Sequence, residues 1–412
     1  MIVVTSRPNN AVQKSAAFRI IPVAPLASGD YVPFISKLGI STTQAIQIRE
    51  AIRKSPSKLT SLISTPLMLT MVVIVYQSEY EIPETLPEFF DKLFHVVFTR
   101  HDKLKAAYSR KHHSGLSERK LLSLFEAFCF MSMQNSFTRS LSSEQFERAF
   151  NDATEYAEDC KCESDNFKLD LTKVACLMIE EGLDTTTFLH KSIMEYYAAS
   201  FIKHSADEVA ALFYAEVAED SRYWWEVLAF LREIDSFRYC KNFAIPESKI
   251  IKSNYFEVEN QRTNKSLVNI LAKCYPGLCL NLTPSDEEKQ LLKVSSYGPF
   301  RQEKYLGMIN FSTMLLDPIE KTIPDPLTSS AVRELFEGLN IKEKSGTKIY
   351  ELPVSLLIMK LGGEHFWKAI DAFLSKLDKQ SEEALKVIEQ QEKRKAIFSK
   401  KQVIKKWAPK GP

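Results

Sequence analysis

Three short segments place a chemically capable residue at the end of a strand or at the start of a helix. Arg7 follows the β-branched run Ile2–Val4. Pro66 follows Thr65 at a helix start, and His190 directly precedes a helical pattern. A guanidinium matches phosphate oxygens through a rigid fork of donors, and proline presents an apolar ring on a backbone of fixed φ. Taken singly, each residue also has a purely structural explanation. Arg7 would belong to a turn, Pro66 would begin a helix, and His190 would be a hydrogen-bonded histidine at a helix N-terminus.

The sequence motifs of the common catalytic and metal sites are missing. No Gly-x-x-x-x-Gly-Lys-Ser/Thr loop occurs, and residues 346–348 (Gly-Thr-Lys) lack both the upstream glycine and the hydroxyl residue after lysine. Cys160 with Cys162, and Cys274 with Cys279, do not have the spacing of zinc ligands. Because Gly-x-Ser-x-Gly is also missing, we expect no catalytic residue, no metal ligand and no enzymatic activity of this chain by itself.

The composition is that of a helical globular protein. The chain has 412 residues, of which 45% are apolar and 26% charged, and 12 are glycine. The length allows two or three domains, and the balance of apolar and charged residues excludes a disordered or fibrous chain. Tight hairpins and phosphate-binding loops use glycine, so the low glycine content favours a mainly α fold with few such loops.

Charge and cysteine content bear on partners and compartment. The net charge is +2, but the last twenty residues carry eight Lys/Arg and no Asp/Glu, so that removing those eight charges leaves −6 on residues 1–392. Seven irregularly spaced cysteines indicate reduced thiols rather than a disulfide framework. The chain begins without a secretory signal, and the most apolar run, Leu67–Tyr76, is too short to span a bilayer. We therefore expect a cytoplasmic protein without membrane contact.

The first hundred residues change from strand to helix patterns. Ile2–Val4 and Phe18–Val23 are strand fragments that cannot form a stable sheet alone. Helical patterns start at Tyr31. Thr65 followed by proline begins a buried helix that runs to about residue 76, and Phe89–Thr99 is an amphipathic helix.

The next hundred residues combine helices with one hairpin. Ser142 and Gln145 form a capping box at the start of a helix. Two strand-like runs, Val174–Ile179 and Thr185–Leu189, form a hairpin, and a helix follows directly. This order favours a winged-helix-like domain over 112–205.

The last part of the chain is predicted to be helical. Tyr223–Ile234 has aromatic residues at helical spacing, and Leu352–Leu377 forms one or two helices around Gly362. Ser381–Ile397 is a polar, helix-forming stretch before the basic end of the chain.

In their order along the chain, the three segments resemble the NACHT family of STAND nucleotide-switch ATPases, which includes NOD-like receptors and bacterial antiviral sensors. Val3–Pro8 resembles the sensor-1 strand with its Thr-Ser-Arg, and residues 65–67 resemble the Thr-Pro-Leu of the helical domain beside the nucleotide. Phe188–Ala199 resembles the winged-helix signature Phe-x-His-x-Ser-(Ile)-x-Glu-(Tyr)-x-Ala-Ala. The resemblance covers about residues 1–205.

The resemblance implies a nucleotide-binding role for three residues. Arg7 would sense the terminal phosphate of the nucleotide, and Pro66 would pack near the adenine. His190 would donate a hydrogen bond to a phosphate of ADP and so tether the winged helix to the nucleotide domain. Exchange of ADP for ATP would weaken this tether and open the molecule for oligomerisation.

The resemblance also implies that this chain corresponds to the downstream part of such a switch. In the family, the P-loop (Walker A) and the acidic magnesium strand (Walker B) lie upstream of the sensor-1 strand, and ATP or ADP would bind only if that portion completes the site. The implied order is the end of a P-loop α/β domain followed by helical domains. The expected boundaries are terminal strands over 1–30, a helical domain over 31–111, a winged helix over 112–205, a helical C-terminal or sensor region over 206–392 and a basic tail over 393–412.

The leading hypothesis is the regulatory or sensor half of a NACHT-type signalling ATPase of antiviral defence. Its expected partners are an upstream NACHT nucleotide-binding portion or a related NACHT protein, and a ligand protein at the C-terminal region. One alternative is a nucleic-acid-binding winged helix with a basic tail, which is disfavoured because residues 140–184 carry twelve acidic and four basic side chains. A second alternative is a truncated modulator of an intact NACHT protein.

Overall fold

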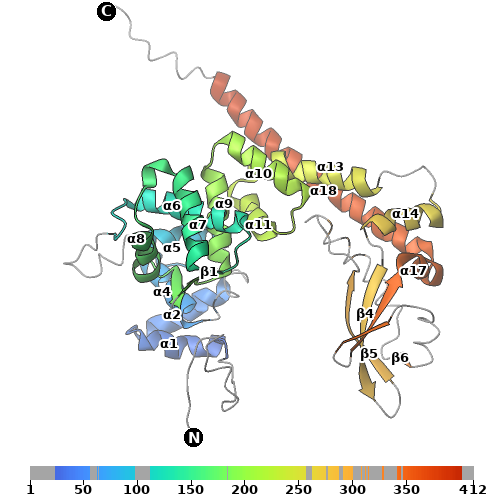
Figure 1. Cartoon of the computed structure of the whole chain (residues 1–412), viewed down its shortest axis with the longest axis horizontal. Helices are drawn as coiled ribbons and strands as arrows, with labels where there is room; N and C mark the ends of the chain where they lie inside the picture. Colours follow the sequence, from blue (N-terminus) through green and yellow to red (C-terminus); the bar gives the residue numbers. More distant parts are fainter. Residues whose placement is uncertain are drawn as a thin grey trace, which may run out of the picture. The chain divides into compact units, whose positions relative to one another are not determined.

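A computed structural model describes most of the helical parts of the chain. The described residues are 24–55, 63, 65–97, 112–182, 184–256, 262–274, 277–286, 291–299, 308, 311, 314, 327–328, 341–344 and 347–400. Most of them are helical, which confirms the expectation of a mainly α protein (Figure 1). Arg7, the two predicted N-terminal strands and residues 401–412 of the basic tail lie outside the described residues.

The chain divides into two compact units. Unit 1 comprises Met1–Ser205 together with Ala229–Ile234, and unit 2 comprises Ala206–Leu228 together with Asp235–Pro412. Pro66 and His190, two of the residues named by the family resemblance, therefore belong to unit 1.

Unit 1 begins with five described helices, and three of them start at a side-chain cap. They are η2 (Ser28–Asp30), α1 (Tyr31–Lys37), α2 (Thr42–Lys54), α4 (Pro66–Glu79) and α5 (Leu86–His95). Thr65 caps α4, because its Oγ1 accepts a hydrogen bond from the amide of Met68 at 3.3 Å. Pro66 occupies the first turn, where backbone amides have no partner within the helix, so the lack of an amide hydrogen costs no helical hydrogen bond. α4 buries apolar side chains on most of its sides, as a core helix does. The predicted helix is confirmed, and it runs one turn further than expected.

The rest of unit 1 is a small sheet flanked by helices. In chain order the elements are α6 (Glu118–Gln134), β1 (Ser140–Ser142), α7 (Ser143–Tyr156), η4 (Glu158–Cys160), α8 (Ser164–Leu169), η5 (Asp170–Val174), β2 (Met178–Glu181), β3 (Thr185–Phe188) and α9 (Lys191–His204). The strands are antiparallel in the order β1-β3-β2. The predicted capping box is confirmed: Ser142 Oγ accepts from the Gln145 amide at 3.2 Å, and Gln145 Oε1 accepts from the Ser142 amide at 3.0 Å. The predicted hairpin is also present, as β2 and β3.

The first strand of that hairpin is shorter than the predicted Val174–Ile179. The structure has a π-helical turn up to Val174, and β2 begins at Met178. Asp170, in the π-helical turn, is fully buried, and its carboxylate accepts hydrogen bonds from the amides of His113 (2.7 Å) and Ser114 (3.0 Å). A contact between segments far apart in sequence thus overrides the local strand preference.

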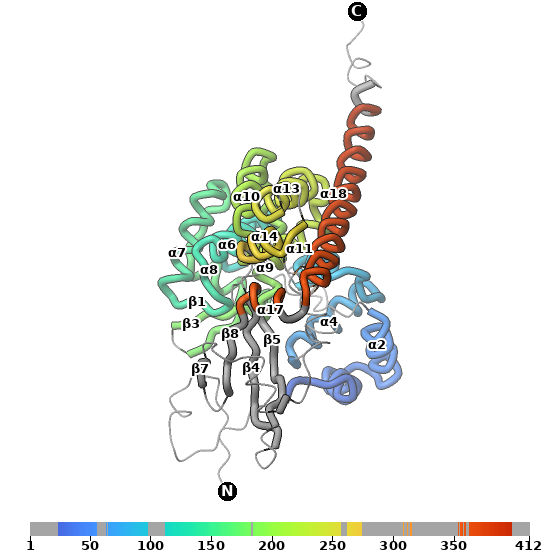
Figure 2. Tube along the Cα trace, turned by 90° about the vertical axis from the view of Figure 1, so that its right-hand side faces the viewer, coloured from blue at the N-terminus to red at the C-terminus, as the bar shows by residue number. Residues whose placement is uncertain are grey.

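α9 joins the two halves of unit 1 through an aromatic core. It lies along α6 in both views (Figures 1 and 2). Tyr197 in α9 lies 4.8 Å from Phe125 of α6 between ring centroids, and its hydroxyl donates to the carbonyl of Phe90 in α5 at 2.8 Å. The neighbouring Tyr196 ring stacks on Phe90 at 5.2 Å. The helices of 31–97 and those of 112–205 therefore share one core.

Unit 2 contains the remaining helices that the structure describes. They are α10 (Asp207–Glu219), α12 (Ser236–Tyr239), η6 (Cys240–Ala244), α13 (Ile245–Ile251), η7 (Lys252–Phe256), α14 (Asn264–Cys274), α17 (Val354–Leu361) and α18 (Gly363–Lys400), while α11 (Trp225–Ile234) is divided between the units. Arg262 ties α18 to the start of α14 through a bidentate pair with Asp371, with N–O distances of 2.7 and 2.8 Å. The predicted helices around Gly362 are confirmed, and α18 continues through the first residues of the predicted basic tail.

A five-stranded antiparallel sheet corrects the expectation of an entirely helical region over 206–392. Its strands are β4 (Gly277–Asp286), β5 (Leu291–Pro299), β6 (Leu327–Thr328), β7 (Ile341–Lys344) and β8 (Thr347–Pro353), in the order β6-β5-β4-β8-β7. Figure 1 labels the first three of them. β4 pairs with β8 about seventy positions further along the chain, from Gly277 opposite Pro353 to Leu282 opposite Lys348. Such pairing depends on tertiary partners rather than on local pattern, so a reading of helical spacing misses it.

Candidate functional site

The candidate site lies where the hairpin of unit 1 leads into α9. His190 is the N-cap of this helix, with an extended backbone at φ −143° and ψ 145°. Its ring Nδ1 accepts a hydrogen bond from the amide of Ser192 at 3.1 Å. Because Nδ1 is the acceptor, the neutral ring carries its proton on Nε2. His190 therefore presents an N–H donor at Nε2, for which the described residues offer no hydrogen-bond acceptor.

The surroundings of His190 keep its ring neutral. The side chain is partly buried. Burial lowers the pKa of His190 below its ordinary value, and the positive charge of Arg139 lowers it further. A neutral imidazole with a fixed Nε2–H can donate one hydrogen bond to an anionic oxygen without itself carrying charge.

The residues after His190 in the motif have packing roles. Glu195 is 3% exposed, and its carboxylate pairs with Lys191 Nζ at 2.7 Å, one helical turn earlier. Ala198 and Ala199 are fully buried, and Tyr197 is almost so. These side chains fix α9 in the core, so that the position of His190 is coupled to the helices on which α9 packs.

Pro66 lies at the start of α4, and it is exposed. Its carbonyl accepts a hydrogen bond from Thr70 Oγ1 at 2.9 Å. Pro66 and His190 thus occupy the first turn and the N-cap of two different helices of one unit, α4 and α9, which are connected through α5. Arg7, the third predicted residue, lies outside the described residues.

Arg139 is a site residue that the sequence does not indicate. It precedes β1, and its guanidinium reaches the backbone just before His190. The two segments are about fifty positions apart, and no motif marks an arginine whose partners are backbone carbonyls. The sequence gives no local signal either, because the strand that follows Arg139, Ser140–Ser142, contains no β-branched or aromatic residue.

A second polar cluster in unit 1 involves the other end of α9. Glu126 of α6 is 5% exposed, and it accepts hydrogen bonds from Ser200 Oγ at 2.6 Å and from His204 Nδ1 at 3.1 Å. The hydrogen bond to Glu126 raises the pKa of His204. The serine hydroxyl donates to the carboxylate rather than to the histidine, so the cluster lacks the serine–histidine contact of a nucleophilic triad.

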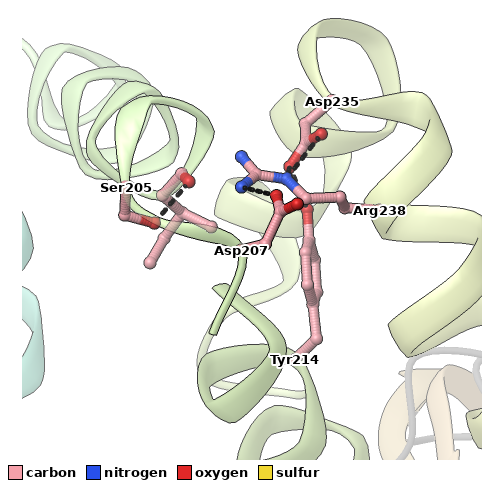
Figure 3. A network of polar contacts seen from close by, with 6 residues as sticks. Ser205, Asp207, Tyr214, Asp235 and Arg238 are labelled. Carbon is pink, nitrogen blue, oxygen red and sulfur yellow. Dashed lines mark hydrogen bonds and ion pairs between the residues drawn. The ribbon is translucent and has the colours of Figure 1, made fainter. Parts of the chain in front are cut away.

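A polar network in unit 2 is a structural clamp. Arg238 lies between two carboxylates, at 3.1 Å from Asp207 and 2.9 Å from Asp235 (Figure 3). Tyr214 OH donates to Asp235 at 3.1 Å. Burial raises the pKa of Asp235, against the opposing effect of Arg238. Each of these charged groups has a partner, so the network joins α10 to α12 rather than offering a free binding group.

Metal and membrane features are not found in the part of the chain that the structure describes. That part contains no group of three or more His, Cys, Asp or Glu side chains arranged to hold a metal ion. Burial, the largest cause, raises the pKa of the Cys160 and Cys162 thiols to about 11, so both are protonated at neutral pH. Among the described helices, none is both long enough and apolar enough to cross a bilayer.

Neither a scan against protein-family models nor a search of curated proteins finds a match to this chain. The geometry around His190 is therefore the basis for a functional proposal.

Proposed function

We propose that this chain is the regulatory, non-catalytic portion of a NACHT-type nucleotide-switch ATPase, with a role in antiviral defence signalling in the cytoplasm. The observation that carries the proposal is the state of His190: a neutral ring at a helix N-cap, with Nδ1 occupied and Nε2–H left to donate. This is the donor that the family resemblance requires at this position.

The arrangement of elements around His190 supports the same proposal. The order α6, β1, α7, α8 with η5, β2, β3, α9 and the sheet order β1-β3-β2 suit a winged helix over 112–205. The capped helix start at Pro66 suits the helical domain of 31–111. Region 206–392 would then be the sensor that receives a ligand protein.

The nucleotide site would be completed by a second polypeptide portion. His190 would donate its Nε2–H to a phosphate oxygen of ADP, and the exposed Pro66 would offer an apolar surface to the adenine. Arg7 would contact the terminal phosphate. The nucleotide-binding portion of a NACHT protein would supply the P-loop and the acidic magnesium strand. ATP or ADP is thus the cofactor of the completed switch.

The core of unit 1 suggests how the signal at His190 would travel. α9 carries His190 at its first turn, and it carries Tyr196 and Tyr197 in the core that includes Phe90 of α5. A change in the hydrogen bonding of His190 would therefore act on the packing between 31–97 and 112–205. A ligand can bias such a packing only by its differential affinity for two states.

The alternative nucleic-acid function has less support. The run Ile193–Ile202 of α9 is buried throughout, so this part of the helix has no free face for a DNA groove. The region from Ser140 to Asp184 is acidic, with twelve acidic and four basic residues. Salt-dependent binding to duplex DNA that survives deletion of 393–412 would favour this alternative. Co-purification with an intact NACHT protein would favour the truncated modulator.

The proposal is tested with variants that separate capping from donation. His190→Asn keeps an N-cap acceptor but removes the ring Nε2–H, because the asparagine side chain is shorter and its amide nitrogen does not extend to the position of Nε2; His190→Ala removes both groups. His113→Ala is the matched control, since His113 is exposed and takes part in the structure through its backbone amide. The chain is first combined with the P-loop polypeptide encoded upstream of Met1 or adjacent to it, and the affinity for fluorescently labelled ADP is measured.

We expect both His190 variants to weaken ADP binding by about 10- to 150-fold, because a hydrogen bond to a charged group contributes about 1.5–3 kcal/mol. The His113 control should bind ADP as the original chain does. The chain alone should not hydrolyse ATP. Unchanged ADP affinity in His190→Asn, or robust ATP turnover by the chain alone, would contradict the proposal. So would the lack of any P-loop sequence in the neighbouring DNA.

A further inference from the structure

We propose that Arg139 is the positioning residue for His190: its guanidinium clamps the two backbone carbonyls that precede the histidine and so holds the ring as a helix cap with Nε2–H left to donate. This deepens the proposed function, and it rests on that function only for the biological use of the Nε2–H. The clamp itself can be tested without any nucleotide.

The clamp is a fork of two donors on consecutive carbonyls. Arg139 Nε donates to the carbonyl of Phe188 at 2.7 Å, and Nη2 donates to the carbonyl of Leu189 at 2.8 Å. The backbone of Arg139 adds a third link, because its carbonyl accepts from the Phe188 amide at 3.0 Å. A guanidinium presents these donors in one rigid plane, which a lysine ammonium does not.

The segment before His190 is also held from its other side. The amide of Leu189 donates to the carbonyl of Leu177 at 2.9 Å, next to the start of β2. Phe188 is fully buried, and Leu189 is 6% exposed. Residues 188–189 therefore lie between β2 on one side and the residue before β1 on the other. The extended backbone of His190, which its Nδ1 needs in order to reach the Ser192 amide, follows directly from this restraint.

The charge of the clamp acts in the same direction as its geometry. The Arg139 charge favours the neutral ring of His190, and only a neutral ring can accept at Nδ1 while it donates at Nε2. Geometry and charge are distinct contributions, so variants of Arg139 can separate them. Arg139→Gln removes the charge and the fork, and Arg139→Lys keeps the charge but loses the fork.

The test is NMR of the histidine ring nitrogens in the full chain with labelled histidine. The chain has seven histidines, and the His190 signals are assigned as those lost in His190→Asn. Each Arg139 variant is compared with Arg148→Gln, an exposed arginine of the same unit, on α7, with no hydrogen bond to residues 188–190. The readouts are the ring tautomer at pH 7.5 and the pKa of His190, which a merely structural arginine would not change.

We expect Arg139→Gln to raise the pKa of His190 and to lower the ratio of the Nε2–H to the Nδ1–H tautomer about fivefold, the population equivalent of one net hydrogen bond. Arg139→Lys should lower the tautomer ratio while the pKa stays near that of the original chain. Unchanged tautomer ratios in both folded variants would overturn the inference, as would an equal effect of Arg148→Gln. If Arg139→Gln does not fold, Arg139→Lys carries the same test. Because no nucleotide is used, this result is independent of whether the ADP experiment succeeds.

Discussion

His190 has a capping role that can be measured as stability, separately from any ligand. His190→Ala removes the acceptor for the Ser192 amide at the second helical position of α9, while His190→Asn replaces it with a side-chain oxygen. Asparagine is among the best N-cap residues, and loss of a side-chain cap typically costs about 0.5–2 kcal/mol. The comparison of the two variants therefore isolates the cap.

The structure places the expected cost near the middle of that range. Only the Ser192 amide loses its acceptor, because the next amide, that of Ile193, donates to the His190 backbone carbonyl at 3.1 Å and does not need the side chain. The capping hydrogen bond is also 3.1 Å long, and the ring is partly buried. We expect His190→Ala to lower the free energy of unfolding at pH 7.5 by about 1 kcal/mol, and His190→Asn to change it little.

The same cap predicts a pH dependence with a definite sign. Protonation of Nδ1 abolishes the acceptor and places a positive charge at the positive end of the helix dipole. Burial first, and Arg139 second, lower the pKa of His190 in the folded state. The unfolded state then binds the proton more readily, so the stabilisation by His190 is present above the unfolded pKa of about 6.5 and is lost as pH falls through the folded pKa. Asparagine does not titrate, so the free energy of unfolding of His190→Asn should rise relative to that of the original chain as pH falls from 7.5 to 5.

Urea unfolding followed by far-UV circular dichroism at several pH values measures this difference. All four tryptophans lie beyond residue 205 in the sequence, and the three that the structure describes, Trp224, Trp225 and Trp367, belong to unit 2. Tryptophan fluorescence therefore gives an internal reference in each sample. His113→Ala is the control for the loss of an exposed histidine. Equal stabilities of His190→Ala and His190→Asn at pH 7.5 would refute the capping argument, and parallel pH profiles of His190→Asn and the original chain would refute the titration argument.

Three further predictions concern other parts of the chain. Tyr197→Phe should lower the free energy of unfolding by about 1 kcal/mol in the same urea experiment, because it removes the hydroxyl that donates to the carbonyl of Phe90 and little else; no change would mean that α5 and α9 are joined by packing alone. The hydrogen bond to Glu126 raises the pKa of His204 in the folded state, so His204 stabilises the fold below about pH 6.5 and this stabilisation is lost as pH rises through the folded pKa. His204→Gln should remove it. The difference in unfolding free energy between pH 6 and pH 8.5 should therefore be smaller in the variant than in the original chain. Gly362→Ala should cost about 1–3 kcal/mol, because its φ of 83° and ψ of 151° suit glycine alone while an added Cβ meets nothing within 4 Å; thermal unfolding that matches Gly29→Ala would contradict this.

Local hydrogen bonding made several features of the fold predictable from sequence. Thr65 and Pro66 mark the start of α4, and Ser142 with Gln145 marks the start of α7, because a capping side chain and the amide it satisfies are at most three residues apart. The N-cap position of His190 and the hairpin before it could also be predicted, because both depend on residues that are close together in the sequence. The mainly α composition of the chain could be expected from its low glycine content and its helical patterns.

Long-range contacts decided what the sequence pattern could not show. β4 pairs with β8 about seventy positions away. The first part of the predicted strand Val174–Ile179 is replaced by a π-helical turn, because Asp170 is buried against the amides of His113 and Ser114. The role of Arg139 is of the same kind. Its guanidinium binds carbonyls, which every residue has, and only the pairing of β1 with β3 brings it to the two that precede His190. Sequence thus determined which residue caps α9, and tertiary structure determined the protonation and orientation of its ring.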